Sequence, residues 1–300
     1  MYKGFTALTY NTGNTRFYVS YFTKFKESNY AQVILETPFE ASNNTTKDEF
    51  TRFARACIKD SLSQGDAPLA FHLLYTQKGI LDYTHSNEYL QATRAKLSWC
   101  KAAEASVIYT NYGLSGEMLD TIDLMAKQNI EVIYRELPNF EIIPEFKIEN
   151  AQTTPLLERL TSIFNSSSLP TRAIIESPFA GKTQEEFIDN IRYARACVEH
   201  ALNQNLAPIA SHLLYTQKDI LNDNIPEERN WGIEAGVVWY KQAEASAIFV
   251  DRGISRGMQY GIKRATEQEN TQVLEDQKIP LFNPQHFGKN SEIKKNFIIS

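Results

Sequence analysis

The sequence contains two copies of one unit, and this duplication limits the possible folds more than any other feature does. The segment ARACIKDSLSQGDAPLAFHLLYTQKGIL begins at Ala54, and ARACVEHALNQNLAPIASHLLYTQKDIL begins at Ala194, an offset of 140 residues. Between Glu36 and Met118, roughly two residues in five are identical to their counterparts, and no gap is needed. The duplication predicts two tandem copies of one folded domain.

Each copy alternates β-rich runs with helical patterns. In the second copy the predicted strands are RAIIESPF, IASHLLYTQ, ASAIFVD and TQVLED, and the predicted helices are EEFIDNIRYARACVEHALNQ, EERNWGIEAGVVWYKQA and RGMQYGIKRATEQ. Strands separated by helices favour a parallel sheet with helices on both faces. We therefore expect an α/β protein made of two small, doubly wound, Rossmann-like or flavodoxin-like domains.

The repeat sets the expected domain limits. Residues 31–138 form the first repeat, 139–171 a linker and 172–280 the second repeat, while 281–300 resemble a tail. In the linker, TTPLLERLTSIF predicts a short helix. Residues 1–30 stand outside the repeat and predict a β-hairpin around Asn11-Thr12-Gly13-Asn14, which would cap a sheet edge or form an oligomer contact.

Composition narrows the class of protein. The chain has 31 Lys and Arg against 36 Asp and Glu, a net charge of −5, which argues against nucleic-acid binding and against attraction to anionic membranes. The three cysteines form no CxxC pair, and no secretory signal is visible, so we expect a cytoplasmic protein. No His, Cys or Asp cluster has ligand spacing, so neither a metal nor a cofactor is expected.

Candidate ligand-binding residues follow the predicted strands, because ligands of open parallel sheets bind beyond the carboxyl ends of the strands. Three clusters occur in each copy, and the cluster His-Leu-Leu-Tyr-Thr-Gln is identical in both. The candidates of the second copy are Ser177, Pro178, Phe179, His212, Tyr215, Gln217, Asp251, Gly253, Ser255, Gly257, Met258 and Gln259. Those of the first copy are Pro38, Phe39, His72, Tyr75, Gln77 and Ser115.

Each cluster also has a purely structural interpretation. The Pro-Phe turn can simply end a strand, His72 and His212 can be core histidines, and Gly253-Ile254-Ser255 can be a capped helix start. The same helix start offers free backbone N–H groups, which favour a phosphate or sugar oxygen.

The second copy, IIESPFAG…YARAC…APIASHLLYTQ…PEERNWGIEAG…GISRGMQYGI, resembles a phage and bacterial domain family of unassigned function, which is itself similar to the nucleoside 2-deoxyribosyltransferase superfamily. Ser177-Pro178-Phe179 is similar to the turn that those enzymes use near base and sugar, and Gly257-Met258-Gln259-Tyr260-Gly261 to the segment that carries their nucleophilic glutamate. The resemblance implies a ligand with a ribose-like ring that bears a base, and a phage protein would act in the host cytoplasm.

At the nucleophile position this chain has Gln259 in the second copy and Leu119 in the first. Neither an amide nor an alkyl chain can form the glycosyl ester that a carboxylate forms. Glu228 and Glu234, on the neighbouring predicted helix, are the candidate substitute catalytic carboxylates. The first copy has Arg94 where the second has Glu234, which indicates a degenerate enzyme in the first copy.

Three functional hypotheses follow. The first is a protein that binds a nucleoside- or nucleotide-type ligand, such as one derived from ADP-ribose, and hydrolyses or transfers its N-glycosidic bond. The second is a non-catalytic phage counter-defence sponge that sequesters a nucleotide immune signal. The third is a structural or interaction module. The expected partners are a small nucleotide-type molecule and a second copy in a homo-oligomer, without nucleic acid or membrane.

Overall fold

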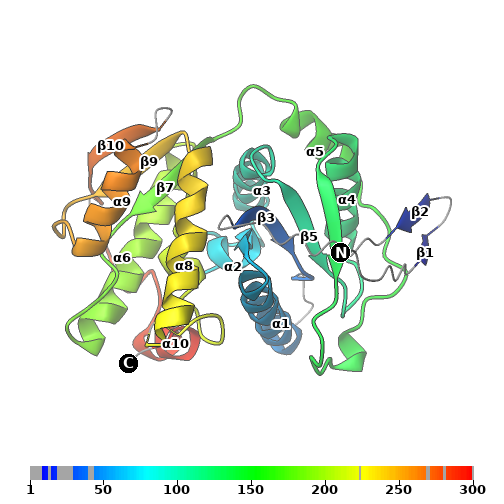
Figure 1. The fold of residues 1–300 in the computed structure, drawn as a ribbon, viewed down its shortest axis with the longest axis horizontal. Helices are drawn as coiled ribbons and strands as arrows, with labels where there is room; N and C mark the ends of the chain where they lie inside the picture. Colours follow the sequence, from blue (N-terminus) through cyan, green and yellow to red (C-terminus); the bar gives the residue numbers. More distant parts are fainter. Residues whose placement is uncertain are drawn as a thin grey trace, which may run out of the picture.

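The computed structural model describes residues 9–12, 15–18, 30–39, 44–222, 224–267, 271–279 and 282–298. Two α/β domains lie side by side (Figure 1), each built on a four-stranded, fully parallel sheet. The predicted tandem α/β fold is confirmed. Among the described residues, no helix is both long and apolar enough to cross a membrane.

Domain 1 follows the strand–helix alternation of its sequence. Its strands and helices are β3 (Ala31–Glu36), α1 (Asn44–Ser63), β4 (Asp66–Leu69), α2 (Phe71–Tyr75), α3 (Ser86–Cys100), β5 (Ala105–Tyr109), α4 (Gly116–Lys127) and β6 (Glu131–Arg135). The sheet order is β4-β3-β5-β6. Helix α1 buries Phe50, Phe53, Ala54, Cys57 and Ile58, whose spacing of three and four residues places them on one face.

Domain 2 repeats this order. It contains β7 (Thr171–Glu176), α6 (Gln184–Asn203), β8 (Leu206–Ile209), α7 (Ser211–Leu214), α8 (Pro226–Val238), the 3-10 helix η2 (Trp239–Gln242), β9 (Ala245–Phe249), α9 (Arg256–Thr266) and β10 (Gln272–Gln277). The sheet order is β10-β9-β7-β8, so each strand keeps the place of its counterpart in domain 1.

Three further segments lie outside the two sheets. The predicted hairpin is present, because β1 (Thr9–Thr12) pairs antiparallel with β2 (Thr15–Tyr18). The linker holds a 3-10 helix η1 (Pro144–Phe146) and the predicted short helix, α5 (Leu157–Phe164), which packs on α3 and α4. The C-terminal segment holds α10 (Asn290–Asn296).

The C-terminal segment is packed against the domains rather than extended as a tail. Phe287, Ile293 and Phe297 are buried, and Gln217 forms an isolated bridge with Phe297. The backbone N–H of Lys218 donates to the carbonyl of Asn296, 2.9 Å away. The expectation of a tail is therefore corrected for residues 282–298, which contribute apolar side chains to the core.

Helices from each domain cross to the sheet of the other. Helix α3 packs on β8 and α8 packs on β4, which are counterpart pairs at the repeat offset. The rings of Trp99 and Trp239 meet edge to face with centroids 5.4 Å apart. Each indole N–H donates to a carbonyl of the other domain, that of Trp99 to Ala207 at 2.8 Å and that of Trp239 to Ala67 at 3.2 Å. The contact between the domains is thus reciprocal.

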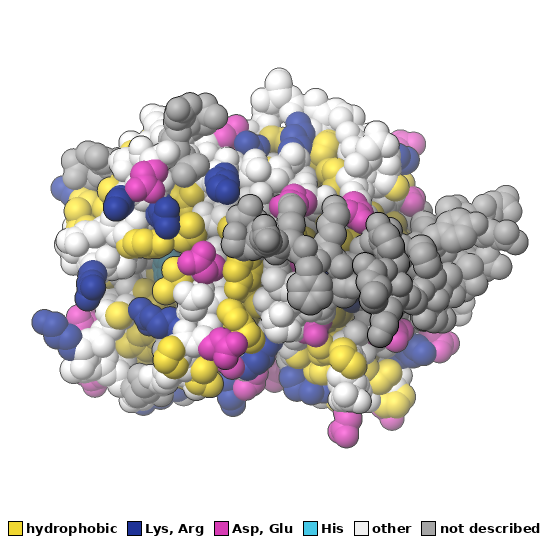
Figure 2. Space-filling view, in the orientation of Figure 1, with side chains coloured by type: hydrophobic (Ala, Val, Ile, Leu, Met, Phe, Trp, Pro, Cys, Tyr) yellow, Lys and Arg dark blue, Asp and Glu magenta, His cyan; other side chains and the backbone are white. Residues whose placement is uncertain are grey.

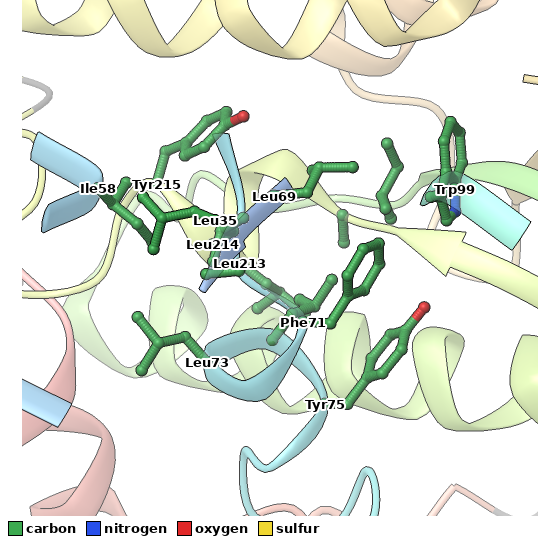
Figure 3. Packing of buried hydrophobic residues seen from close by; sticks show 14 of the residues in the cluster. Leu35, Ile58, Leu69, Phe71, Leu73, Tyr75, Trp99, Leu213, Leu214 and Tyr215 are labelled. Carbon is green, nitrogen blue, oxygen red and sulfur yellow. The ribbon is translucent and has the colours of Figure 1, made fainter. Parts of the chain in front are cut away.

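The repeated His-Leu-Leu-Tyr-Thr-Gln segment lies in the centre of this interface, where side chains from both domains pack together (Figure 3). The Tyr75 hydroxyl donates to the Pro208 carbonyl at 2.9 Å, and the Tyr215 hydroxyl donates to the Pro68 carbonyl at 3.1 Å. Both tyrosines are buried. The two identical tyrosines therefore make equivalent hydrogen bonds, one from domain 1 to domain 2 and one from domain 2 to domain 1.

The glutamines at the end of the segment behave in the same way. The Gln77 amide donates to the Leu213 carbonyl at 3.0 Å, and the Gln217 amide donates to the Leu73 carbonyl at 3.2 Å. Their carbonyl oxygens accept from the guanidinium groups on the facing domain, Arg195 to Gln77 at 3.1 Å and Arg55 to Gln217 at 3.2 Å.

These contacts correct one part of the expected site. Tyr75, Gln77, Tyr215 and Gln217 direct their polar groups at the other domain instead of at a ligand. A buried polar group needs a partner, and here the facing copy supplies it. The identity of the segment in the two repeats has a structural cause, since each copy must fit the other.

Candidate functional site

A cavity and a groove lie at one end of the domain 1 sheet. The connection after β3 leads to β4 on one side, and the connection after β4 leads back past β3 to β5 on the other side, so the topological switch point lies between β3 and β5. Crevices at the carboxyl ends of such strands are the usual ligand sites of open α/β sheets. Residues after β3 and β5 line a cavity at this point, among them Thr37, Phe39, Ser115 and Glu117.

The site has an inner and an outer part. The inner cavity measures about 60 Å³, and the outer groove measures about 1020 Å³. Both are lined by Phe39, His72, Tyr83, Tyr89 and Glu117, which therefore mark the junction between them. A groove of this size falls in the range of small-molecule sites.

Glu36 and Lys96 form a buried ion pair inside the inner cavity. Glu36 ends β3, Lys96 projects from α3, and Lys96 Nζ is 2.5 Å from Glu36 Oε1. The ammonium also donates to the Thr121 hydroxyl on α4, at 3.2 Å. Burial opposes the charged form of Lys96, but the Glu36 carboxylate outweighs it and raises the Lys96 pKa. The Lys96 side chain is therefore charged at neutral pH.

Glu117 is the second carboxylate of the site. It lies in the first turn of α4, where the N-terminal end of the helix dipole stabilises a negative charge. The Tyr89 hydroxyl on α3 donates to Glu117 Oε1. The Tyr83 ring meets the Tyr89 ring edge to face, with centroids 5.7 Å apart. These contacts fix the carboxylate between a phenol and the helix start.

His72 and His212 play the same part in the two domains. Nε2 of His72 shares a hydrogen bond of 3.0 Å with the Thr37 hydroxyl, and Nε2 of His212 shares one of 3.1 Å with the Ser177 hydroxyl. Burial lowers the pKa of His72 to about 3, with a further contribution from Lys96, and lowers that of His212 to about 4. Both imidazoles are neutral at physiological pH, so neither can act as a proton donor there.

The Pro-Phe turn packs on these histidines. The ring of Phe39 lies 5.1 Å from that of His72, and the ring of Phe179 lies 5.2 Å from that of His212. Pro38 and Pro178 are buried beside them. Of these residues, Phe39 and His72 line the open groove of domain 1.

Domain 2 has a different arrangement at the same place. The counterpart of Lys96 is Gly236, so Glu176 lacks the ammonium that Glu36 has, and the Tyr240 hydroxyl donates to it instead. Helix α9 lies close above this carboxylate, since a Cβ on Gly261 would be 2.0 Å from Glu176 Oε1. Burial raises the pKa of Glu176 to about 7, although the Tyr240 hydrogen bond opposes the shift.

The outer walls differ between the copies as well. In domain 1, Glu88 of α3 and Glu199 of α6 both line the groove. Their counterparts are Glu228 and Lys59, which form a salt bridge at 3.0 Å that joins α8 to α1. The same acidic position therefore lines an open groove as Glu88 in domain 1, and forms a salt bridge to the other domain as Glu228 in domain 2.

The proposed catalytic carboxylates Glu228 and Glu234 are not brought to the strand ends. Glu228 accepts the backbone N–H of Asn222 at 2.7 Å in addition to its bond with Lys59. Glu234 is exposed on α8, two residues from Gly236, whose inner face contacts Ser211. At about 100° per residue these positions lie on nearly opposite faces of the helix. The carboxylates that line the inner cavity of domain 1 are instead Glu36 and Glu117.

Most of the remaining candidates make contacts that stabilise the fold. The hydroxyls of Ser115 and Ser255 cap α4 and α9, each accepting a backbone N–H at 3.3 Å. Met258 is buried in the core, and Asp251 accepts the backbone N–H of Ile279 at 3.1 Å. The other three, which lie at the exposed start of α9, are Gly253, Gly257 and Gln259.

Five residues that line the inner cavity were not among our candidates, namely Glu36, Tyr83, Tyr89, Lys96 and Glu117. The available signal was a contrast between the copies, since Lys96 and Glu117 stand where the second copy has glycine. Throughout the described part of the chain, no group of three His, Cys, Asp or Glu side chains could hold a metal ion.

Comparison with known proteins gives a family but no function. No curated protein and no solved structure matches the chain. The model of a family described as "Domain of unknown function (DUF7768)" matches residues 31–135 and again 171–274, which are the two domains of the structure. The chain belongs to this family and contains two copies of its domain.

Proposed function

We propose that domain 1 binds a ligand made of a base and a ribose, with the sugar at the inner cavity and the base in the groove. The observation that carries this proposal is the set of two fixed carboxylates, Glu36 and Glu117, at the switch point of an open parallel sheet.

The shape of the site matches a ligand of two parts. The inner cavity of about 60 Å³ admits hydroxyl groups or the edge of a ring, but not a whole nucleoside. Carboxylates are acceptors, so Glu36 and Glu117 suit the hydroxyls of a sugar. Phe39, Tyr83 and Tyr89 offer aromatic surfaces at the mouth, and a nucleobase stacks well on such rings. The resemblance to nucleoside 2-deoxyribosyltransferases adds to this match.

The proposal assigns the ligand to domain 1 and a supporting role to domain 2. In domain 2 the corresponding acid, Glu176, lies beneath α9, and the corresponding outer wall is bridged by Lys59 and Glu228. Domain 2 also contributes Glu199 and Asn203 to the groove of domain 1, and the C-terminal segment contributes His286. The third hypothesis, a structural or interaction module, is favoured for domain 2, because domain 2 packs reciprocally against domain 1.

Native mass spectrometry with nucleosides, nucleotides and ADP-ribose derivatives tests the proposal. The wild-type protein should retain a ligand that contains ribose, and Glu117→Gln should weaken its retention at least about tenfold, because a charge-assisted hydrogen bond is lost. Glu234→Gln makes the same chemical change on the exposed side of α8 and is the matched control. Equal retention by both variants would refute the assignment of the site.

The same experiment separates binding from catalysis. A ligand recovered intact identifies a sequestering protein, as the sponge hypothesis requires. Free base and free sugar identify cleavage of the N-glycosidic bond, for which Glu117 is then the candidate carboxylate.

A further inference from the structure

We infer that the domain 1 site favours an N-riboside whose base carries a positive charge over a neutral or phosphorylated analogue. This inference rests on the proposed function and specifies the chemical class of its ligand. It is argued from the charges and rings that line the site.

The walls of the site carry an excess of negative charge. Five carboxylates line the cavity and the groove, those of Glu36, Asp82, Glu88, Glu117 and Glu199, against three ammonium groups, those of Lys47, Lys78 and Lys96. The formal excess is two negative charges. In a concave site, charges of one sign raise the local concentration of ligands of the other sign.

Two of the three positive groups already have partners in the site. Lys96 is paired with Glu36 inside the inner cavity. Lys47 lies 6.0 Å from the centroid of the Phe39 ring, which it approaches as a cation. Among the described residues that line the two cavities, none is an arginine, the side chain best suited to bind a phosphate through two hydrogen bonds.

The start of α4 carries an acid where a phosphate would otherwise bind. Helix N-termini attract anions, and Glu117 occupies this position in domain 1 with its own carboxylate. The counterpart helix of domain 2 begins with Arg256 and Gly257, so an anion would meet no carboxylate there. The contrast shows that the negative charge belongs to the domain 1 site and not to the fold.

Aromatic rings and a carboxylate meet at the junction. Tyr83 and Tyr89 line both the cavity and the groove, beside Glu117. Aromatic faces attract cations, and a nearby carboxylate adds a direct charge interaction. A flat cationic base such as a pyridinium ring satisfies both, while the ribose reaches the inner cavity.

Three closely matched probes test the inference by isothermal titration calorimetry. Nicotinamide riboside carries a cationic base, its reduced dihydropyridine form is neutral with nearly the same shape, and nicotinamide mononucleotide adds a phosphate. We expect the cationic riboside to bind about tenfold more tightly than the reduced form, as an aromatic and charged site implies. The mononucleotide should bind more weakly than the riboside.

A pair of variants on one helix measures the contribution of the wall charge. Glu199→Gln removes a carboxylate from the groove and should reduce the preference for the cation roughly two- to threefold. Glu185→Gln removes the same charge from the exposed first turn of α6 and should leave the preference unchanged.

The outcomes distinguish this inference from the function on which it rests. If the reduced riboside or the mononucleotide binds as tightly as the cation, the charge preference is refuted while binding of a base–ribose ligand stands. If none of the three binds, and the nucleoside panel also fails, the proposed function is refuted together with the inference.

Discussion

Replacing Glu176 by glutamine should make the stability of the protein less sensitive to alkaline pH. The carboxyl group lies beneath α9 and accepts a hydrogen bond from Tyr240, and burial raises its pKa from 4.5 to about 7. Between about pH 4.5 and pH 7 the folded state therefore keeps the proton while the unfolded state releases it. The stability that this group contributes is full below pH 4.5 and is lost as the pH rises to about 7.

The expected magnitude follows from the shift. A difference of about 2.5 units corresponds to about 3 kcal/mol at pH 8, with 1.36 kcal/mol for each unit. Glutamine has nearly the same shape, accepts from the Tyr240 hydroxyl and does not ionise. The variant should exceed the wild type in free energy of unfolding by up to about 3 kcal/mol at pH 8, and by much less at pH 5.

Urea unfolding of both proteins at the two pH values measures this difference. Glu36→Gln is the control from the other domain, because it removes the partner of Lys96 and should destabilise the protein at both pH values. A gain for Glu176→Gln that is equal at pH 5 and pH 8 would mean that Glu176 is ionised in the folded protein. The buried, protonated carboxyl group described above would then be refuted.

Three further predictions concern contacts that stabilise the fold, each checked by the free energy of unfolding in urea. Tyr75→Phe and Tyr215→Phe should each lower the free energy of unfolding by about 1 kcal/mol, because a buried hydrogen bond between domains is lost. If neither variant is less stable than the wild type, the two hydroxyls are hydrated and do not bond across the interface. Phe297→Ala should cost about 3 kcal/mol, since it empties a buried position of the C-terminal segment; a change below about 0.5 kcal/mol would indicate a detached tail. Lys96→Met should lower the free energy of unfolding by about 3 kcal/mol, because Glu36 is left unpaired. Adding Glu36→Gln to this variant should recover most of the loss. If the double variant is no more stable than Lys96→Met, the ion pair does not stabilise the protein.

The fold could be predicted because its information is local and repeated. Strand and helix patterns alternate in the same order in each copy, and such an alternation has few solutions other than a parallel sheet covered by helices. The short linker helix, Leu157–Phe164, was visible in the spacing of its apolar residues for the same reason.

The site was harder to predict because identity between the copies has two possible causes. A shared ligand and a shared interface both preserve residues in a duplicated protein, and a single sequence does not separate them. The segment that contains Tyr75 and Tyr215 is identical because the copies contact each other through it. Its physical role depends on packing between segments that are far apart in the chain.

The open site instead depends on the residues in which the copies differ. Lys96 and Glu117 are replaced by Gly236 and Gly257, and these exchanges decide whether the strand ends hold charged groups or lie beneath a helix. We interpreted the differences of the first copy as degeneration, because it has Arg94 where the second copy has Glu234. The structure shows that the same copy contains the ion pair of Glu36 with Lys96 and a carboxylate, Glu117, that accepts a hydrogen bond from Tyr89.

The most direct test of the central claim is a map of hydrogen–deuterium exchange with and without the nucleoside that binds most tightly. The account predicts protection in residues 36–39, 83–89 and 115–118 of domain 1, which line the cavity and the groove. Protection in the counterpart residues 176–179, 224–229 and 255–258, with domain 1 unchanged, would contradict it and assign the ligand to domain 2.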